Sequence, residues 1–343
     1  MSGTSSSADI VYVDDQQPGI TRRKVRRGWG YWDADGRRIA DRDAIDRLNG
    51  IGLPPAYANA WFCPDPRGHI QATGQDERGR KQYRYHPAFR EAQEAAKYDR
   101  CADFGEHLAK LRARVAHDLR RRGLCKEKAV AAVVRLLDLG SIRVGNEQYA
   151  QANKSFGATT LRKRHARVKG QTLRLQFRAK SGRLRVLTIT DGSLSRFVRR
   201  CQDLPGQHLF RWLDDAGEAH PVTSTDVNAY IREAMAEDFT AKHFRTWGAS
   251  VLAFRALAGA DGHLGLKAML APVTEALGNT PAIARKAYVH PALVDLARDR
   301  EAQAGWHAEL RLPRATRWLN RYERGLIAFL EGLAAHQQPR KAA

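Results

Sequence analysis

Five side chains in four separate segments of the chain could together carry out chemistry on a phosphate ester. They are two guanidinium groups, one primary amine, one neutral amide and one phenol: Arg143, Lys180, Arg245, Asn279 and Tyr288. Guanidinium groups bind the non-bridging oxygens of a phosphodiester and hold the charge that builds up on pentacoordinate phosphorus. The phenol can attack the phosphorus, and the amine can protonate the departing sugar oxygen. The set suits a metal-free attack that requires no carboxylate cluster.

The phenol of Tyr288 needs activation before it can act as a nucleophile. A free tyrosine has a pKa near 10, so only about one phenol in a thousand is ionised at pH 7. The field of two nearby guanidinium groups stabilises the phenolate as it forms. We therefore expect Arg143 and Arg245 to lie beside Tyr288, with Lys180 within reach of the leaving oxygen.

Each of these residues also has an ordinary interpretation. Arg143, which follows a helix end, could be a solvated arginine, and Lys180 could be an exposed turn lysine. Arg245 lies in the aromatic segment 242–248, where burial without a partner would be costly. It needs either a structural carboxylate or a bound anion. Tyr288 could simply pack inside a helix.

The pattern of apolar residues predicts the elements that position these side chains. Between residues 22 and 87, Gly, Pro and aromatic residues predict short strands joined by tight turns. Segment 87–139 has apolar residues at helical spacing, so two or more helices should end there with Gly140 as C-cap. Helical periodicity is also found in three later segments: 226–258, 272–301 and 317–333.

A β-hairpin should present Lys180. Apolar and polar residues alternate through segment 172–179, with Leu173, Leu175 and Phe177 on one face. Lys180-Ser181-Gly182 then forms a turn, and a second strand follows over residues 184–190. Lys180 is therefore predicted at the hairpin tip.

Length and charge point to two domains and a polyanionic partner. The 343 residues exceed the roughly 250 to 300 at which one core stops growing. Lys and Arg number 58 against 37 Asp and Glu, a net charge of +21 that favours nucleic acid. Residues 1–100 carry +3 and residues 101–343 carry +18, so the second part should make most phosphate contacts. A merely soluble basic surface is the alternative.

The cysteines and the N-terminus indicate a reduced, cytoplasmic protein. The four cysteines form no C-x-x-C pair, which disfavours a zinc site and a disulfide framework: Cys63, Cys101, Cys125 and Cys201. Residues 1–10 are Ser-rich and lack the apolar segment of a signal peptide, and no run of about 18 apolar residues occurs. We expect no metal and no cofactor.

Together, these residues make the chain resemble the type IB DNA topoisomerases of the compact bacterial and poxvirus kind, from about Gly28 to Leu333. The family pattern is an Arg, a hairpin Lys, a second Arg, a His or Asn nine residues before the nucleophile, and the nucleophilic Tyr. The chain supplies the five in that order: Arg143, Lys180, Arg245, Asn279 and Tyr288. Poxvirus-like members have His where Asn279 stands, whereas bacterial members commonly have Asn, so the bacterial branch matches better. A neutral hydrogen bond to a phosphate oxygen is then implied there.

The resemblance implies an α+β fold of the tyrosine recombinase and topoisomerase IB type. It comprises a small β-rich N-terminal domain and a mainly α-helical catalytic domain with a small β-hairpin or sheet. The expected parts are a flexible N-terminal segment, a DNA-clamping domain, the catalytic domain and a C-terminal tail: residues 1–20, 21–95, 96–335 and 336–343.

Segment 79–85 resembles the family's strand that touches bases and phosphates in the groove. It and the segment after the first catalytic Arg supply the expected DNA contacts: Arg80, Lys81, Gln82, Tyr83, Tyr85 and Tyr149. Strand alternation places Tyr83 and Tyr85 on one face and Gln82 on the other. The two tyrosines could instead pack the core of the β-rich domain.

The implied activity is relaxation of supercoiled double-stranded DNA. Tyr288 attacks one strand, forms a 3′-phosphotyrosyl bond and frees a 5′-hydroxyl; the duplex then rotates and is resealed without ATP or a metal. Arg143 and Arg245 are assigned to the scissile phosphate, Lys180 to general acid catalysis and Asn279 to a non-bridging oxygen. We expect a monomer associated with the nucleoid, with no membrane and no obligate protein partner.

Two other functions remain open. A tyrosine recombinase shares the catalytic domain and nucleophile, but it usually carries His three residues before the second arginine. Here Lys242 holds that position, and His243 stands at a different offset. A non-catalytic DNA-binding clamp would keep the fold and lose the chemistry, although all five catalytic residue types are present.

Overall fold

The computed structural model describes residues 10–26, 28–77 and 79–337, apart from the side chains of residues 94–97, 149 and 336–337. The chain divides into two compact units, Met1–Lys97 and Tyr98–Ala343. The sequence places its domain boundary between residues 95 and 96, which remains a prediction. The α+β class predicted from the sequence is confirmed. No described helix has the length and apolar character needed to cross a membrane.

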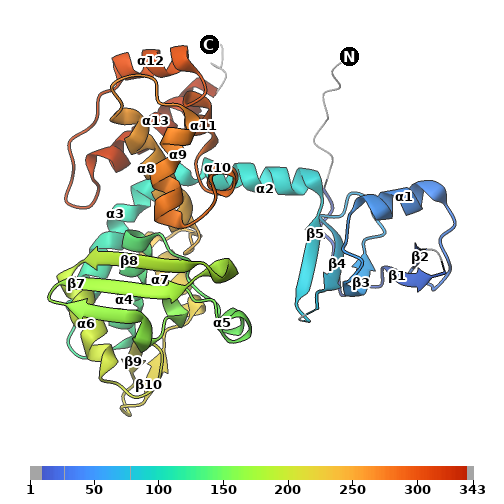
Figure 1. The fold of residues 1–343 in the computed structure, drawn as a ribbon, viewed down its shortest axis with the longest axis horizontal. Coiled ribbons are helices and arrows are strands. Elements are labelled where there is room, and N and C mark those ends of the chain that lie inside the picture. Colours follow the sequence, from blue (N-terminus) through green and yellow to red (C-terminus); the bar gives the residue numbers. More distant parts are fainter. Residues whose placement is uncertain (1–9, 27, 78, 338–343) are drawn as a thin grey trace. The chain divides into compact units, whose positions relative to one another are not determined.

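The first unit is a five-stranded antiparallel sheet with one helix packed on it (Figure 1). The strand order is β2-β1-β3-β4-β5. Its elements, with the helix α2 that runs on into the second unit, are β1 (Ile20–Val25), β2 (Gly28–Trp32), α1 (Arg42–Gly50), β3 (Ala58–Phe62), β4 (Ile70–Gln75), β5 (Lys81–Tyr85) and α2 (Pro87–Asp99). A small core joins the helix to the sheet through buried side chains: Ile20, Tyr31, Leu48, Leu53, Phe62 and Ala72.

The sequence interpretation missed α1, because only strands and turns were expected between residues 22 and 87. The signal was present: Asp41 accepts a hydrogen bond from the backbone N–H of Ala44 at 2.9 Å, as an N-cap does. Ile45 and Leu48 then follow at helical spacing and pack into the core.

Part of the expected flexible N-terminal segment is instead attached to the sheet. Val11 pairs with Gly68 in a parallel bridge, and the backbone N–H of His69 donates to the Val11 carbonyl at 2.8 Å. The Lys81 amine forms an ion pair with Asp15 at 2.6 Å. Residues 11–15 therefore contact the first unit, residues 1–9 lie outside the described part of the chain, and the flexible segment 1–20 stays a prediction.

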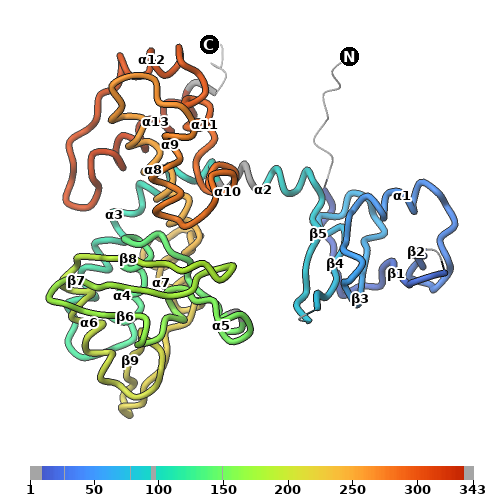
Figure 2. Tube along the Cα trace, viewed as in Figure 1, coloured from blue at the N-terminus to red at the C-terminus, as the bar shows by residue number. Residues whose placement is uncertain are grey.

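The second unit is mainly helical (Figures 1 and 2). Its helices are α3 (Cys101–Asp118), α4 (Lys126–Gly140), α5 (Glu147–Asn153), α6 (Gly192–Gln202), α7 (Ser224–Met235), α8 (His243–Ala258), α9 (Leu266–Leu277), α10 (Pro281–Ala287), α11 (Pro291–Leu296), α12 (Arg300–Glu309) and α13 (Arg321–Gln337). Its strands are β6 (Ala166–Lys169), β7 (Thr172–Arg178), β8 (Leu184–Thr190), β9 (Arg211–Leu213) and β10 (Ala219–Pro221). One large core unites these elements.

Helix α4 lies at the centre of this core. Every residue from Ala129 to Val134 is at most 3% exposed, so this apolar middle part of the helix is covered on all sides. Figure 1 shows the antiparallel sheet β6-β7-β8 lying over it. The predicted hairpin is confirmed as β7 and β8, with Leu173, Leu175 and Phe177 buried on the inner face.

Three predicted helical boundaries need correction. Gly140 is the last residue of α4, and the left-handed C-cap is Ser141, with φ 47°. The helical segment 226–258 is broken after α7, where Ala236 takes up a left-handed conformation with φ 57°. Segment 272–301 is divided into several helices, because Gly278 ends α9 and Thr280-Pro281 starts α10.

Arg112 connects three helices of the second unit through buried ion pairs. From α3, its guanidinium group lies 2.8 Å from Asp138 of α4 and 2.7 Å from Glu323 of α13. It also donates to the Trp318 carbonyl at 2.5 Å. Because each carboxylate is almost fully buried, neither has a solvent alternative if the arginine is lost.

We predict that Arg112→Gln lowers the free energy of unfolding by about 3–5 kcal/mol, because two buried carboxylates lose their charged partner. Urea denaturation of the purified variant measures this change. Arg298→Gln is the matched control, since Arg298 and Asp295 form an exposed pair at 3.7 Å. The control should cost less than about 1 kcal/mol. Equal losses in the two variants would contradict the prediction.

Candidate active site

The loop that carries Arg143 is fixed by the buried Ile142 before it and by the backbone of residues 157 and 158 beside it. After the left-handed Ser141, Ile142 is buried at 3% exposure. The Arg143 carbonyl accepts from the Ala158 N–H at 2.9 Å. Gly157 lies so close that a Cβ there would stand 2.6 Å from the same carbonyl oxygen. Neighbouring backbone therefore fixes the start of the Arg143 side chain.

Arg245 is buried in α8, where its guanidinium group lies beside the Tyr288 phenol. The residue is 4% exposed, and its Nη1 donates to the Ser141 carbonyl at 2.6 Å. Nε and Nη2 are buried and make no hydrogen bond of good geometry with a described residue. Burial lowers the pKa of Arg245 to about 10, opposed by the Tyr288 phenol. The guanidinium is still charged at pH 7, and two of its donor groups remain available for an anion.

Tyr288 stands at the C-terminal end of α10, beside both arginines. Its hydroxyl lies 3.4 Å from Nη2 of Arg143, and Cζ of Arg245 lies 4.6 Å from the centre of its ring. Burial alone would raise the pKa of this phenol. The charges of Arg245 and Arg143, with hydrogen bonding from Arg245 and Asn279, bring the pKa below the ordinary tyrosine value. The site therefore stabilises the phenolate relative to that of an ordinary tyrosine.

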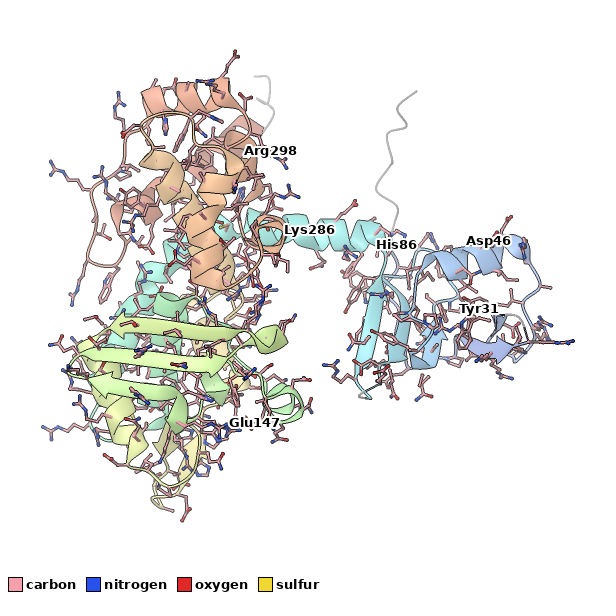
Figure 3. The ribbon with its side chains drawn as sticks, in the orientation of Figure 1. Tyr31, Asp46, His86, Glu147, Lys286 and Arg298 are labelled. Atoms are coloured by element: carbon pink, nitrogen blue, oxygen red, sulfur yellow. The ribbon has the colours of Figure 1, made fainter. Side chains whose placement is uncertain are left out.

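The backbone around Tyr288 is fixed from two sides. Ser250 of α8 accepts from the N–H of His290 at 3.0 Å through its hydroxyl, which also lies 3.5 Å from the Tyr288 carbonyl. The Tyr98 hydroxyl donates to the carbonyl of Lys286 at 3.2 Å, and its ring packs edge-on against His290. Figure 3 labels Lys286 on α10. Contacts within the second unit thus hold the segment that carries Tyr288.

Asn279 occupies the short connection between α9 and α10. Gly278 before it has φ 65°, a left-handed conformation that favours glycine, and Thr280 after it caps α10. The Nδ2 atom of Asn279 is buried without a hydrogen-bond partner of good geometry among the described residues. The amide is therefore a donor close to Tyr288, in keeping with its effect on the phenol pKa.

Lys180 lies in the turn between β7 and β8 and is exposed. With Arg143 and Arg245 it lines an open pocket with an empty volume of about 360 Å³. The structure therefore brings all five predicted residues to one place. The functional groups there are cationic or neutral donors, which suit an anion. In the part of the chain that the structure describes, no three His, Cys, Asp or Glu side chains gather as metal ligands.

Two further pocket residues were missed by the sequence interpretation: Arg183 and Arg185. The signal was the alternation of β8. Arg185 has the same parity as Leu187 and Ile189, which face inward, whereas Leu184 and Val186 are exposed. A charged residue on the inner face of a strand needs a buried partner, so the position of Arg185 in this alternation indicates a residue with a specific polar contact.

In the first unit, Tyr83 and Tyr85 lie on the surface of β5 and do not pack the core. They are 40% and 41% exposed, and their rings stack with centres 5.9 Å apart. Three neighbours already have acidic partners within the unit. Arg80 and Gln82 contact Asp76 at 2.7 and 3.1 Å, and Lys81 pairs with Asp15. The side chain of Tyr149, predicted to contact DNA, lies outside the described part of the structure.

Sequence families and a viral relative match most of the chain. The family described as "Eukaryotic DNA topoisomerase I, catalytic core" matches residues 86–287. "Bacterial DNA topoisomerase IB, N-terminal domain" matches residues 28–76. DNA topoisomerase 1B of Acanthamoeba polyphaga mimivirus is 32% identical over 243 residues, 70% of this chain and 72% of the viral protein. The chain belongs to the type IB DNA topoisomerases.

Other similarities to this topoisomerase IB are narrower. DNA topoisomerase 1 of Mycosarcoma maydis is 28% identical over 143 residues, 36% of this chain and 14% of the fungal protein. The XerH site-specific recombinase bound to difH, before cleavage, covers 63% of this chain at 15% identity and a TM-score of 0.34. Only 56% of that recombinase chain is matched, and so low a score does not establish a shared fold. The catalytic-core match ends at residue 287 and does not include Tyr288.

We predict that Arg143→Ala raises the pKa of Tyr288, because burial raises it and one of the two opposing guanidinium charges is removed. NMR titration of protein with carbon-13 in the tyrosine rings measures the ionisation directly. The wild-type phenol should ionise at lower pH than the phenol of the variant. Arg178→Ala, on an exposed position of β7, should leave the titration unchanged. Ionisation of the Arg143→Ala phenol at the wild-type pH would show that the two groups do not interact.

Proposed function

We propose that this topoisomerase IB relaxes supercoiled duplex DNA by cutting one strand with Tyr288 and resealing it after rotation. The Tyr288 oxygen bonds to phosphorus while the bond from phosphorus to the 5′ oxygen breaks. The departing oxygen takes a proton and leaves as a hydroxyl. That hydroxyl later displaces the phenol, so the energy of the phosphodiester is conserved and no ATP is consumed. The main support for this proposal is that the Tyr288 phenol lies beside two guanidinium groups, which lower its pKa.

Each side chain of the site has a distinct role in this proposal. The unused Nε and Nη2 donors of Arg245 bind non-bridging oxygens of the scissile phosphate, with Arg143 beside them. Asn279 donates its buried Nδ2 to a non-bridging oxygen. Lys180 is exposed at the rim of the pocket and protonates the 5′ oxygen as it leaves.

The first unit is proposed to contribute DNA contacts through β5. The exposed stacked rings of Tyr83 and Tyr85 offer flat apolar faces to a groove. Arg80, Lys81 and Gln82 would exchange their present carboxylate partners for phosphates or base edges. Tyr149 is a further proposed DNA contact. A monomer acting at the nucleoid is the proposed state of the protein.

The decisive experiment is incubation with supercoiled plasmid in EDTA without ATP, followed by trapping in denaturant. We expect relaxation and a protein-linked 3′ end in the wild type. Tyr288→Phe should bind DNA with the same salt dependence and form no adduct, because only the attacking oxygen is lost. An adduct of undiminished yield in the variant would remove Tyr288 from the nucleophile role. DNA binding without relaxation by the wild type would favour a non-catalytic clamp.

Lys180→Ala should slow single-turnover cleavage by about 100-fold or more, because the leaving oxygen loses its proton donor. A duplex whose bridging 5′ oxygen is replaced by sulfur tests the role, since a thiolate leaves without protonation. We expect the sulfur substrate to restore cleavage to within about threefold of the wild-type rate. Failure of the sulfur substrate to restore the rate would show that Lys180 is not the acid.

A further inference from the structure

Lys180 lies beyond the part of its hairpin that the hydrophobic core holds. On β7 the last buried side chain before the turn is Phe177, and on β8 the first after it is Ile189. The residues of the turn are exposed, and Leu184 just after it is 62% exposed. Apolar packing therefore does not fix the position of the Lys180 backbone. Another interaction has to do so if the amine is to reach the leaving oxygen.

Polar contacts to the end of α9 supply that interaction. Arg185 of β8 donates from Nη1 to the Glu275 carbonyl at 3.0 Å and from Nη2 to the Ala276 carbonyl at 2.5 Å. Arg183 donates from Nη1 to the Gly278 carbonyl at 3.3 Å. Carbonyls in the last turn of a helix lack an intrahelical donor and carry the negative end of the helix dipole. Two arginines of the hairpin therefore satisfy three backbone carbonyls at the end of α9.

These contacts hold Arg185 where its charge is otherwise unfavourable. Arg185 is partly buried and lines the same pocket as Arg143 and Arg245. Burial, together with the charge of Arg143, lowers its pKa. The fit is also close, because a Cβ on Gly278 would stand 2.9 Å from Cδ of Arg185. The two carbonyl contacts that join the hairpin to α9 explain why a charged side chain is placed here despite the cost of burying it.

We propose that Arg185, assisted by Arg183, is a positioning residue that fastens the hairpin to the C-terminal end of α9 and so keeps Lys180 at the scissile phosphate. The proposal rests on the proposed role of Lys180 as general acid. It assigns the two arginines no contact with the DNA during cleavage.

The hairpin is the partner that moves when this connection is lost. The end of α9 and the segment after it are anchored in the core by Leu277, Ala284 and Val289, all at most 2% exposed. Asn279 and Tyr288 therefore keep their places without Arg185. Only Lys180, at the exposed tip, depends on the connection, so the effect of losing Arg185 should fall on the proton transfer step.

Single-turnover cleavage of a saturating duplex by Arg185→Gln tests the proposal. Glutamine removes the charged fork that spans two carbonyls. We expect cleavage of the ordinary duplex to slow by about 10- to 50-fold, a partial loss of general acid catalysis. With sulfur at the bridging 5′ position, the same variant should cleave within about threefold of the wild-type rate. An equal loss on both substrates would overturn the proposal, because it would place Arg185 at the phosphate.

A double-mutant comparison gives an independent result. In a Lys180→Ala background, Arg185→Gln should slow cleavage by less than about threefold, because the side chain that it positions is already gone. If the rate loss in the double variant equals the product of the losses in the two single variants, Arg185 acts independently of Lys180 and the proposal fails.

Two controls separate this proposal from a folding defect and from failure of the proposed function. Arg178→Gln removes one positive charge from the same hairpin at a side chain with no contact to α9 among those described, and should cleave at the wild-type rate. Thermal unfolding of Arg185→Gln should match that of Arg178→Gln. Absence of an adduct from the wild type would refute the proposed function, whereas a cleaving wild type with an unaffected Arg185→Gln would refute only the positioning role.

Discussion

The active site of the second unit depends on a buried arginine that pairs with no carboxylate among the residues the structure describes. Arg245 is charged and 4% exposed, and among the described residues its guanidinium group donates to the Ser141 carbonyl and lies beside the Tyr288 phenol. Burial of an unpaired charge is expensive, and the core of the unit must offset that cost. The remaining donors of Arg245 and the positive charge of Arg143 beside the Tyr288 phenol then make a site in which negative charge is favoured. An anionic transition state finds its compensating charge already in place.

Several unusual backbone conformations follow from this arrangement. Ser141 takes up φ 47° immediately after α4, and this turn directs its carbonyl at Arg245. A Cβ on Gly248 of α8 would stand 2.6 Å from Oγ of Ser141, so the two segments meet closely because that residue is glycine. Gly278, at φ 65°, ends α9 where Arg185 binds. Ser141 is the strained residue among these, because a left-handed conformation disfavours any residue other than glycine, and strain of this kind is typical of functional sites.

Sequence patterns predicted the hairpin, the helical unit and the five site residues, but they could not predict the contacts between them. Alternation in β7 is a local property, and a side-chain period of two specifies which face is buried. The left-handed cap at Ser141 in place of Gly140 depends on Arg245, more than 100 residues later in the chain. The role of Arg185 likewise depends on where α9 ends. Helix α1 was missed although the Asp41 cap was visible, because the turn residues around it dominated the interpretation.

The two units prepare for a polyanion in different ways. In the second unit, donors of Arg245 and Asn279 are buried beside the Tyr288 phenol with no carboxylate partner among the described residues, so a phosphate gains their hydrogen bonds without displacing a carboxylate. In the first unit, Arg80 and Lys81 pair with Asp76 and Asp15, so a phosphate must replace an existing partner. Exchange of one anionic partner for another gains little free energy. Binding energy and salt dependence should therefore come mainly from the second unit, while the exposed rings on β5 add contacts that need no exchange of charge.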